Sequence, residues 1–588
     1  MTDQSMPQAA QQASGAALPA IPAGWPVRTL DEVRAELCVP GQPFAIETAV
    51  IRGVPTKVWK NAPPSLPVLM AAARLHGARD FLVYGDERVT FAAFHRAVAA
   101  LAAALAARGV AKGDRVALAM RNLPEWPVAF FAITALGAIA VPLNAWWTGE
   151  ELAFALTDSG AALLIADADR WARIAPHADE LPLRGTLVTR ASGSAAGTQQ
   201  LEDLIGPPTT WHTLPDADLP PASVASDDPA GIFYTSGTTG KPKGALGTHR
   251  NLTTNIVTSA WSVAQSALRR GEPVPESKPR VILLAVPLFH VTACSATLMG
   301  ALAAGSMIVM IHKWDTREAM RLIEKERVTL TGGVPFIAWQ LIEHPDRGAF
   351  DLSSLEAIAY GGAPSAPELV SAIWQTFGAL PGNGWGMTET MATVTHHMAE
   401  DYLNRPSSCG PPAPVAAIEV RAEDGVTMLP AGTVGELWAS GPMIVAGYWN
   451  RPEATAQTFV NGWVRTGDLA QIDAEGFCTI VDRAKDVIIR GGENIYSIEV
   501  ENVLYEHPAV TDVALVGVPH RTLGEEPAAV VHLAPGAEAS EAELKAFVAA
   551  RLAGFKVPVR VAFSAETLPR NANGKILKAE IRALLAKA

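Results

Sequence analysis

The sequence alternates apolar, β-branched runs with helical patterns over most of its length. Strand-like runs occupy residues 115–120, 161–166, 280–286 and 307–311, and an alanine-rich helical pattern over residues 94–108 stops at Gly109. This alternation is typical of helices layered around largely parallel strands, because consecutive parallel strands are usually joined by a helix. We therefore predict an α/β fold.

The chain of 588 residues is too long for one hydrophobic core, since single cores stop growing at about 250–300 residues. Glycine-punctuated strands at residues 435–447 and 476–481 predict a β-rich subdomain. A polar joint at residues 482–486 separates it from a compact series with helices at 497–505, 541–552 and 575–585 and strands at 510–518 and 528–533. We predict a flexible leader (1–45), a large N-terminal domain of layered α/β subdomains with a β-rich subdomain (46–482), and a small mobile α+β C-terminal domain (483–588).

Composition excludes several functional classes. A formal net charge of -12 gives no general attraction to a phosphate backbone, so we expect no nucleic-acid partner. The four cysteines form no Cys-x-x-Cys pair, so neither a disulfide framework nor a zinc site is indicated. The first 25 residues lack a basic start and a continuous apolar stretch, unlike a signal peptide. We expect a cytoplasmic protein.

Residues 291–311 are uncharged over a length that could span a bilayer. Gly305 and Ser306 interrupt this stretch, which predicts a buried helix followed by a strand. We expect no transmembrane segment, although peripheral membrane contact stays open.

The most specific segment is YTSGTTGKPKG at residues 234–244, which follows a strand-like run. Its glycines allow tight turns that direct backbone N–H groups at an anion, and its hydroxyls and lysines add donors and positive charge. It is not a Walker A loop, because Pro242 follows Lys241 where a magnesium-binding Ser or Thr would stand. The predicted nucleotide contacts are Thr235, Ser236, Gly237, Thr238, Thr239, Gly240, Lys241 and Lys243.

This loop resembles the signature of the adenylate-forming enzymes, which include acyl-CoA synthetases, 4-coumarate:CoA ligases, luciferases and peptide-synthetase adenylation domains. The resemblance continues in order through PLFH (287–290), YGGAP (360–364), WGMTET (385–390), TGDL (466–469), DRAKD (482–486), RGGEN (490–494) and PRNANGK (569–575). It covers about residues 65–585. ATP, Mg²⁺ and coenzyme A are the implied cofactors and substrates.

The resemblance implies a role for each matching residue. Thr388 would contact the α-phosphate, and Glu389, with Thr235, would hold Mg²⁺, for which a carboxylate beside phosphate oxygens is a normal environment. Asp468 would accept hydrogen bonds from the ribose hydroxyls, with Arg483 as its partner. The adenine contacts would come from Trp385, Gly386 and Met387, and Trp385 stands where the family usually has Tyr.

Lys575 is the predicted catalytic residue. It ends a polar loop just before a helix, so its ammonium group can project into a cleft. The carboxylate of the acid and the α-phosphate of ATP are both anions and repel each other as they approach. A cation between them lowers the energy barrier to their reaction.

In the reaction that the resemblance implies, the acid is first joined to AMP, and the thiol of CoA then displaces AMP. This thiol needs the same general space that Lys575 fills in the first step. The C-terminal domain is therefore expected to rotate, and the resemblance implies a hinge at Lys485, where many relatives have Asp. In the rotated state Gly491 and Gly492 resemble the loop that lines the pantetheine channel, where missing side chains admit a narrow ligand.

The resemblance places His290 at the acyl pocket and Gly361, Gly362 and Ala363 in a wall beside the adenylate. These motifs carry no charged residue that could hold an amino-acid ammonium group, which implies a hydrophobic acid. The amino-acid sequences of the motifs are most similar to those of bacterial medium- or long-chain fatty-acyl-CoA ligases.

We therefore predict an ATP-dependent acid:CoA ligase that acts on small molecules as a monomer or homodimer. The alternatives are an aryl-acid:CoA ligase, an acyl-AMP ligase that loads a carrier protein, a luciferase-like oxidative enzyme, and an inactive nucleotide-binding protein. Retention of Lys575, Glu389 and Asp468 together argues against inactivity, and the Gly491–Gly492 pair favours CoA as acceptor.

Overall fold

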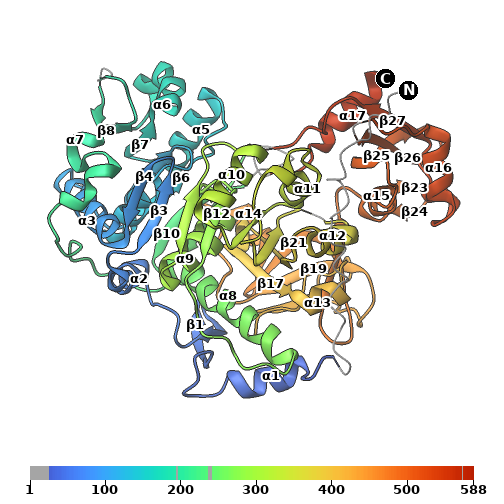
Figure 1. Ribbon diagram of the computed structural model, residues 1–588, viewed down its shortest axis with the longest axis horizontal. Helices are drawn as coiled ribbons and strands as arrows, with labels where there is room; N and C mark the ends of the chain where they lie inside the picture. Colours follow the sequence, from blue (N-terminus) through green and yellow to red (C-terminus); the bar gives the residue numbers. More distant parts are fainter. Residues whose placement is uncertain are drawn as a thin grey trace, which may run out of the picture.

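The computed structural model describes residues 25–193, 197–235, 241–363, 365–534, 536–571 and 574–587. A large part contains three large sheets, a separate two-stranded hairpin and their helices, and a smaller part after residue 483 lies to one side of it (Figure 1). The predicted loop residues Ser236, Gly237, Thr238, Thr239 and Gly240 lie outside the described residues.

The first sheet has seven strands in the order β11-β10-β6-β5-β7-β8-β9. Strands β5 to β10 pair in parallel, and β11 pairs antiparallel with β10. The phosphate loop therefore connects the two strands of an edge hairpin. The strands are β5 Arg115–Ala119, β6 Ile139–Pro142, β7 Leu163–Asp167, β8 Gly185–Thr189, β9 Gln199–Gln200, β10 Pro229–Tyr234 and β11 Gly244–Thr248.

The second sheet has eight strands in the order β17-β16-β15-β14-β12-β13-β3-β4. Its six central strands are parallel, and β4 and β17 are antiparallel edges. The strands are β3 Asp80–Tyr84, β4 Glu87–Thr90, β12 Val281–Leu284, β13 Met307–Met310, β14 Leu330–Gly333, β15 Ala357–Gly361, β16 Leu380–Met387 and β17 Ala392–Met398.

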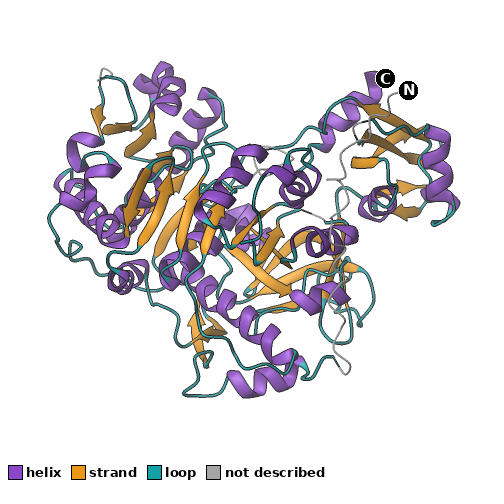
Figure 2. Ribbon diagram, in the orientation of Figure 1, coloured by secondary structure: helices purple, strands orange, loops and turns teal. Residues whose placement is uncertain are grey.

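Helices cover and separate these two sheets (Figure 2). Helix α4 is buried at every position, including Trp126, Phe130 and Phe131, and packs beside α3 in the largest apolar core. A helix that is apolar all round is stable only when it is enclosed. The helices are α2 Leu66–Ala73, α3 Phe91–Ala107, α4 Glu125–Ala135, α5 Gly149–Ser159, α6 Ala168–Ile174, α7 Glu202–Ile205, α8 His249–Arg269, the π-helix η5 Thr292–Leu298, α9 Met299–Ala304, α10 Thr316–Glu326, α11 Pro335–Glu343, α12 Pro367–Phe377 and α13 Ala399–Asn404.

A third, antiparallel sheet forms the β-rich subdomain. Its strands are β18 Ala417–Arg421, β19 Gly435–Ser440, β20 Phe459–Val460, β21 Trp463–Ile472 and β22 Cys478–Arg483, and α14 Pro452–Thr458 precedes β20. The hairpin β1 Ile46–Ile51 with β2 Val54–Trp59 stands apart from these sheets.

The C-terminal part begins its own sheet at Ile488, only five residues after β22 ends. Its strands are β23 Ile488–Arg490, β24 Glu493–Ile495, β25 Val510–His520, β26 Gly524–Leu533 and β27 Arg560–Ser564, and its helices are α15 Ser497–Tyr505, α16 Glu541–Ala549 and α17 Lys578–Lys587. Two apolar clusters on the two faces of this sheet form its core. The short 3₁₀ helices of the chain are η2 Arg74–His76, η3 Ala175–Glu180, η4 Pro208–Thr213, η6 Arg347–Ala349, η7 Thr388–Thr390 and η8 Gly554–Lys556.

The apolar stretch at residues 291–311 forms η5, α9 and β13, with Gly305 in the left-handed conformation (φ +66°) between helix and strand. This is the predicted break. Within the described ranges, none of the helices has the length and apolar character needed to cross a bilayer.

The segment expected as a leader contains a packed helix, α1 Leu30–Leu37. Val33 and Leu37 join the core cluster of the β-rich subdomain, and Thr29 caps the helix through a capping box with Glu32. The described portion of this segment therefore differs from the flexible chain that its composition suggested, because three apolar side chains at helical spacing are buried.

Candidate active site

One cavity of about 2370 Å³ collects most of the predicted site residues. It includes the carboxyl ends of the central strands, where ligands bind in open α/β sheets, and continues along these strands toward their starts. The predicted residues in its lining are Thr235, Lys241, Lys243, His290, Gly361, Gly362, Trp385, Gly386, Met387, Thr388, Glu389, Arg483, Lys485 and Lys575.

Four of the predicted residues that the structure describes are not in this lining: Ala363, Asp468, Gly491 and Gly492. Gly491 and Gly492 form an exposed turn between β23 and β24, with φ of +61° and +92°. Their backbone conformation favours glycine, but in this structure the turn lies outside the cavity lining.

Thr388 and Glu389 directly follow β16 in a tight turn into β17. A Cβ atom at Gly386 would lie 1.5 Å from the carbonyl oxygen of Ala392, so only glycine allows the strands to approach here. Burial raises the pKa of Glu389, while a hydrogen bond from the Tyr448 hydroxyl to its Oε1 (2.6 Å) opposes the shift. The turn thus presents a hydroxyl and an acid to the cavity.

Asp468 lies directly behind the lining and is held by two neighbours. Its Oδ2 accepts a hydrogen bond from the Trp385 indole N–H (2.8 Å), and its Oδ1 pairs with Arg483 Nε (2.9 Å). The pair is set by the sheet register, since Asp468 on β21 stands opposite Arg483 on β22. The indole, predicted to stack on adenine, therefore also positions the predicted ribose acceptor.

Lys575 enters the cavity from the C-terminal part. The segment before α17 extends from that part to the large part (Figure 1). Gly574, with φ +72°, lies so close to Val334 that a Cβ atom would come within 2.6 Å of Val334 Cγ2. Burial, followed by the charges of Arg483 and Lys485, lowers the pKa of Lys575 to about 8, against the opposing effect of Asp468. The ammonium group is thus buried near two other cations, Arg483 and Lys485, in a region that is suited to bind anions.

The two lysines of the phosphate loop lie over aromatic rings. Lys241 Nζ is 4.8 Å from the ring centroid of Phe154, and Lys243 Nζ is 5.0 Å from that of Tyr448. Tyr448 therefore touches both Glu389 and a loop lysine, a role that the sequence analysis missed. Tyr448 directly follows the strand-like run at residues 435–447, but the sequence carries no signal for these contacts, because they join segments that are far apart in the chain.

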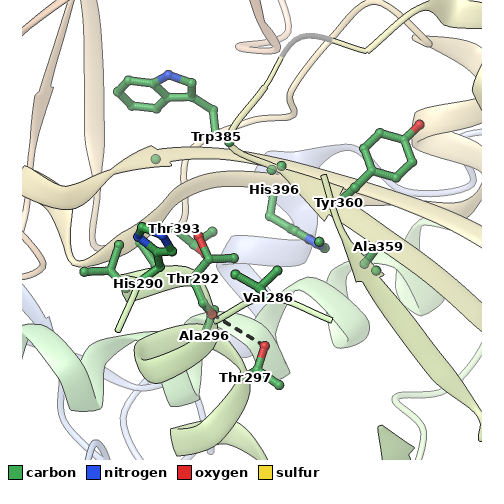
Figure 3. Close-up of a pocket in the computed structure, with 18 of the residues that line it drawn as sticks. Val286, His290, Thr292, Ala296, Thr297, Ala359, Tyr360, Trp385, Thr393 and His396 are labelled. Atoms are coloured by element: carbon green, nitrogen blue, oxygen red, sulfur yellow. Dashed lines mark hydrogen bonds between the residues drawn. The ribbon is translucent and has the colours of Figure 1, made fainter. Parts of the chain in front are cut away.

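The acyl side of the cavity runs between the central sheet and helices α8, η5 and α9. Figure 3 shows His290, Thr292, Ala296 and Thr297 on the helical side, with Ala359 and Tyr360 across from them. Burial lowers the pKa of His290 to about 3, so its ring is neutral at physiological pH. The cavity joins the charged region near Lys575 to one lined mostly by uncharged side chains, with Arg280 and Glu356 beside the starts of β12 and β15.

The AMP-binding enzyme family model matches residues 69–449, and the model of the AMP-binding enzyme C-terminal domain matches residues 499–575. The chain belongs to the AMP-binding enzyme family. The resemblance inferred from the motifs is confirmed, as is the predicted α/β class with a separate C-terminal domain.

Similar proteins within this family span nearly the whole chain. A feruloyl-CoA synthase from Amycolatopsis sp is 38% identical over 499 residues, which cover 85% of this chain and 94% of the relative. The long-chain-fatty-acid–CoA ligase FadD13 of Mycobacterium tuberculosis is 36% identical over 499 residues, covering 84% and 93%. The structure of o-succinylbenzoate CoA synthetase from Bacillus subtilis with its acyl-adenylate intermediate matches with a TM-score of 0.73 and 30% identity over 88% of this chain and 98% of that one.

Replacing Trp385 with Phe should weaken AMP binding about tenfold, because a carboxylate that is no longer oriented would make a weaker hydrogen bond to the ribose, and such a bond contributes about 1.5–3 kcal/mol. The ring face is retained while the indole N–H that orients Asp468 is lost. Calorimetric titration with AMP measures the change. Unaltered affinity in this variant would show that Asp468 needs no donor from Trp385.

The rate of acid-dependent ATP–pyrophosphate exchange should fall as pH rises through about 8. The pKa of Lys575 is lowered from its ordinary value near 10.5 to about 8, so the ammonium form is present below that pH and lost above it. A pH profile of kcat/KM for the free enzyme reports this group. In Lys575→Arg the residual activity should lack this alkaline limb, because the guanidinium group stays charged; a wild-type profile flat to pH 10 would contradict the assignment.

Proposed function

We propose that the protein is an AMP-forming acid:CoA ligase, which converts an acid, ATP and CoA to acyl-CoA, AMP and pyrophosphate. The observation that carries this proposal is the position of Lys575. A cation from the C-terminal part shares one cavity with Arg483, the partner of Asp468 behind the lining, with the Thr388–Glu389 turn and with a channel lined mostly by uncharged side chains. Each feature has a task in forming an acyl-adenylate.

In the first step the acid's carboxylate oxygen attacks the α-phosphate and pyrophosphate leaves. Lys575 reduces the repulsion between the two anions, and its enclosure strengthens that effect because fewer water dipoles screen it. Asp468 holds the ribose, so the α-phosphate is fixed relative to Thr388 and Lys575. Positioning of this kind supplies much of the rate in phosphoryl and nucleotidyl transfer.

Magnesium is expected at Glu389. Its carboxylate is a hard oxygen ligand, and Thr235 offers a hydroxyl in the same lining. Mg²⁺ is usually held by one or two carboxylates together with substrate phosphates, so this donor set fits. The ion would neutralise charge on the leaving pyrophosphate.

In the second step the thiol of CoA displaces AMP. Lys575 occupies the cavity in this structure, and the Gly491–Gly492 turn is exposed away from it. Rotation of the C-terminal part about Lys485 would remove the lysine and bring a turn without side chains to the pantetheine path. Lys485 lines the cavity, and burial lowers its pKa.

The acid is most simply a medium- or long-chain fatty acid. The lining follows strands β12, β14, β15 and β16 over most of their length. From Leu380 to Gly386 such a strand advances about 20 Å at about 3.3 Å per residue, which suits an extended alkyl chain. The channel stays open because small residues face it, among them Ala296, Gly300, Ala303, Ala304, Ala357, Ala359, Gly382 and Gly384.

A shorter aryl acid is the second candidate. It is supported by the 38% identical relative that is named a feruloyl-CoA synthase. An aryl acid would occupy only the part of the channel next to His290 and Gly361.

The reaction would take place in a reducing compartment such as the cytoplasm, on small molecules and by a monomer or homodimer. All four cysteines are free thiols, as is usual where glutathione and thioredoxin keep thiols reduced.

Two substitutions should separate the half-reactions. Lys575→Ala should abolish acid-dependent ATP–pyrophosphate exchange while still converting supplied acyl-AMP and CoA to the thioester. Gly492→Phe should keep exchange and lose thioester formation. Gly536→Phe is the matched control, because Gly536 also has positive φ (+78°) and open space around it in the same part of the chain. Loss of both half-reactions in Gly492→Phe but neither in Gly536→Phe would place Gly492 in folding or docking instead of thiolation.

Filling the channel should change acid preference. A Cβ atom at Gly300 meets no atom within 4 Å, and Gly300 lines the channel on α9. Gly300→Phe should lower kcat/KM for long-chain acids by tenfold or more and spare short and aryl acids, measured as AMP release over a panel of acids. Gly348→Phe, at another open glycine outside the lining, is the control. Equal activity on all chain lengths in Gly300→Phe would exclude this path for the acid.

A further inference from the structure

One of the polar side chains in the channel, away from the expected nucleotide, is a histidine. His396 on β17 lines the cavity, and its ring projects toward the middle of the lining side chains in the view of Figure 3. It is not needed for the chemistry at Lys575, and the motifs gave no reason to single it out. A neutral polar group in such a place selects among ligands.

The backbone gives the ring its position. His396 stands opposite Gly384 in the antiparallel β16–β17 pair, so both residues face the same side of the sheet. A Cβ atom at Gly384 would come within 3.1 Å of His396 Cδ2. The missing side chain at Gly384 therefore leaves the space into which the imidazole extends.

The imidazole is neutral and incompletely satisfied. Burial lowers the pKa of His396 to about 4. Its Nδ1 is enclosed without a hydrogen-bond partner among the described residues, which leaves Nε2 as the nitrogen open to the cavity. A buried N–H without an acceptor is rarer in proteins than an acceptor without a donor. The favoured tautomer therefore carries its proton on Nε2 and directs a donor into the channel.

An all-hydrocarbon ligand would leave this donor unpaired after displacing water, at a cost in binding. An oxygen on the ligand would satisfy it. Gly384 precedes Thr388, the predicted contact of the α-phosphate, by four residues, or about 13 Å along an extended strand. This oxygen would therefore lie several bonds from the carboxylate that reacts there.

We propose that His396 is a specificity residue that donates a hydrogen bond from Nε2 to an oxygen substituent on the acyl part of the acid. This inference rests on the proposed acid:CoA ligase activity and refines its substrate. The acid is hydrophobic but carries a hydroxyl, alkoxy or keto oxygen at mid-length, on an alkyl chain or on an aromatic ring.

The test compares acids that differ by one oxygen. One pair is a straight-chain fatty acid and its mid-chain hydroxy derivative, and the other is cinnamic acid and 4-hydroxycinnamic acid. The wild-type enzyme should favour the oxygenated member of at least one pair about tenfold in kcat/KM for AMP release, as one buried neutral hydrogen bond supports. The pair that discriminates identifies the alkyl or aryl source.

Variants assign the preference to the side chain. His396→Leu should abolish the discrimination or reverse it, and His396→Gln, which keeps an N–H donor, should retain part of it. His397→Gln is the control, because His397 lies on the opposite face of β17, bonds Ser408 O (2.9 Å) and is outside the lining; it should alter thermal stability without altering preference.

The outcomes separate this inference from the proposed function. An enzyme active on acids that shows no preference within either pair, or a His396→Leu variant that loses both members equally, overturns the role of His396 alone. Absence of AMP release with every acid and CoA overturns the proposed function itself.

Discussion

The enclosure of one cation, Lys575, is the constraint on which the rest of the site depends. Its loop reaches the cavity only because Gly574 can lie against Val334 without a side chain between them. Arg570 supports the same contact from the other end of the loop. Its guanidinium group lies 4.6 Å from the ring centroid of Phe336 in the large part, and it donates to the carbonyl oxygen of Gly574 (2.8 Å).

This contact is anchored in the C-terminal core by Asp512. Its buried carboxylate accepts from Arg570 (2.6 Å), the Tyr505 hydroxyl (3.0 Å) and the backbone N–H of Leu568 (3.0 Å). Because a buried carboxylate with three donors resists displacement, Lys575, Arg570 and the C-terminal sheet move as a unit. In the proposed mechanism this docked arrangement would serve adenylation and obstruct thiolation. Lys485, the proposed hinge, lies between β22 of the β-rich sheet and β23 of the C-terminal sheet.

Sequence alone predicted the elements whose periodicity is strong. Helix α15 begins and ends at the expected residues, and β5, β7, β12 and β13 lie within one or two residues of the predicted runs. Strands β23, β24 and β27 were missed, because β23 and β24 have only three residues each and β27 has only three residues between its polar ends, Arg560 and Ser564. The motifs identified most of the residues that line the candidate site. The sequence could not predict the Trp385–Asp468 hydrogen bond, the contacts of Tyr448 or the donor at His396. In each case the residues come together only in the folded chain.

The shape of the channel and the charge at its end are physically coupled. Glycine and alanine keep the channel open. In the proposed reaction, an acid that fills it would displace water from the region next to Lys575. Removing water strengthens the interaction between the ammonium group and the reacting anions, because the local dielectric response falls. An acid that fits poorly leaves water beside Lys575 and weakens that interaction. Recognition of the acyl part, including any oxygen paired with His396, therefore contributes to the rate of adenylation as well as to binding, since binding energy away from the reacting atoms can be used at the transition state.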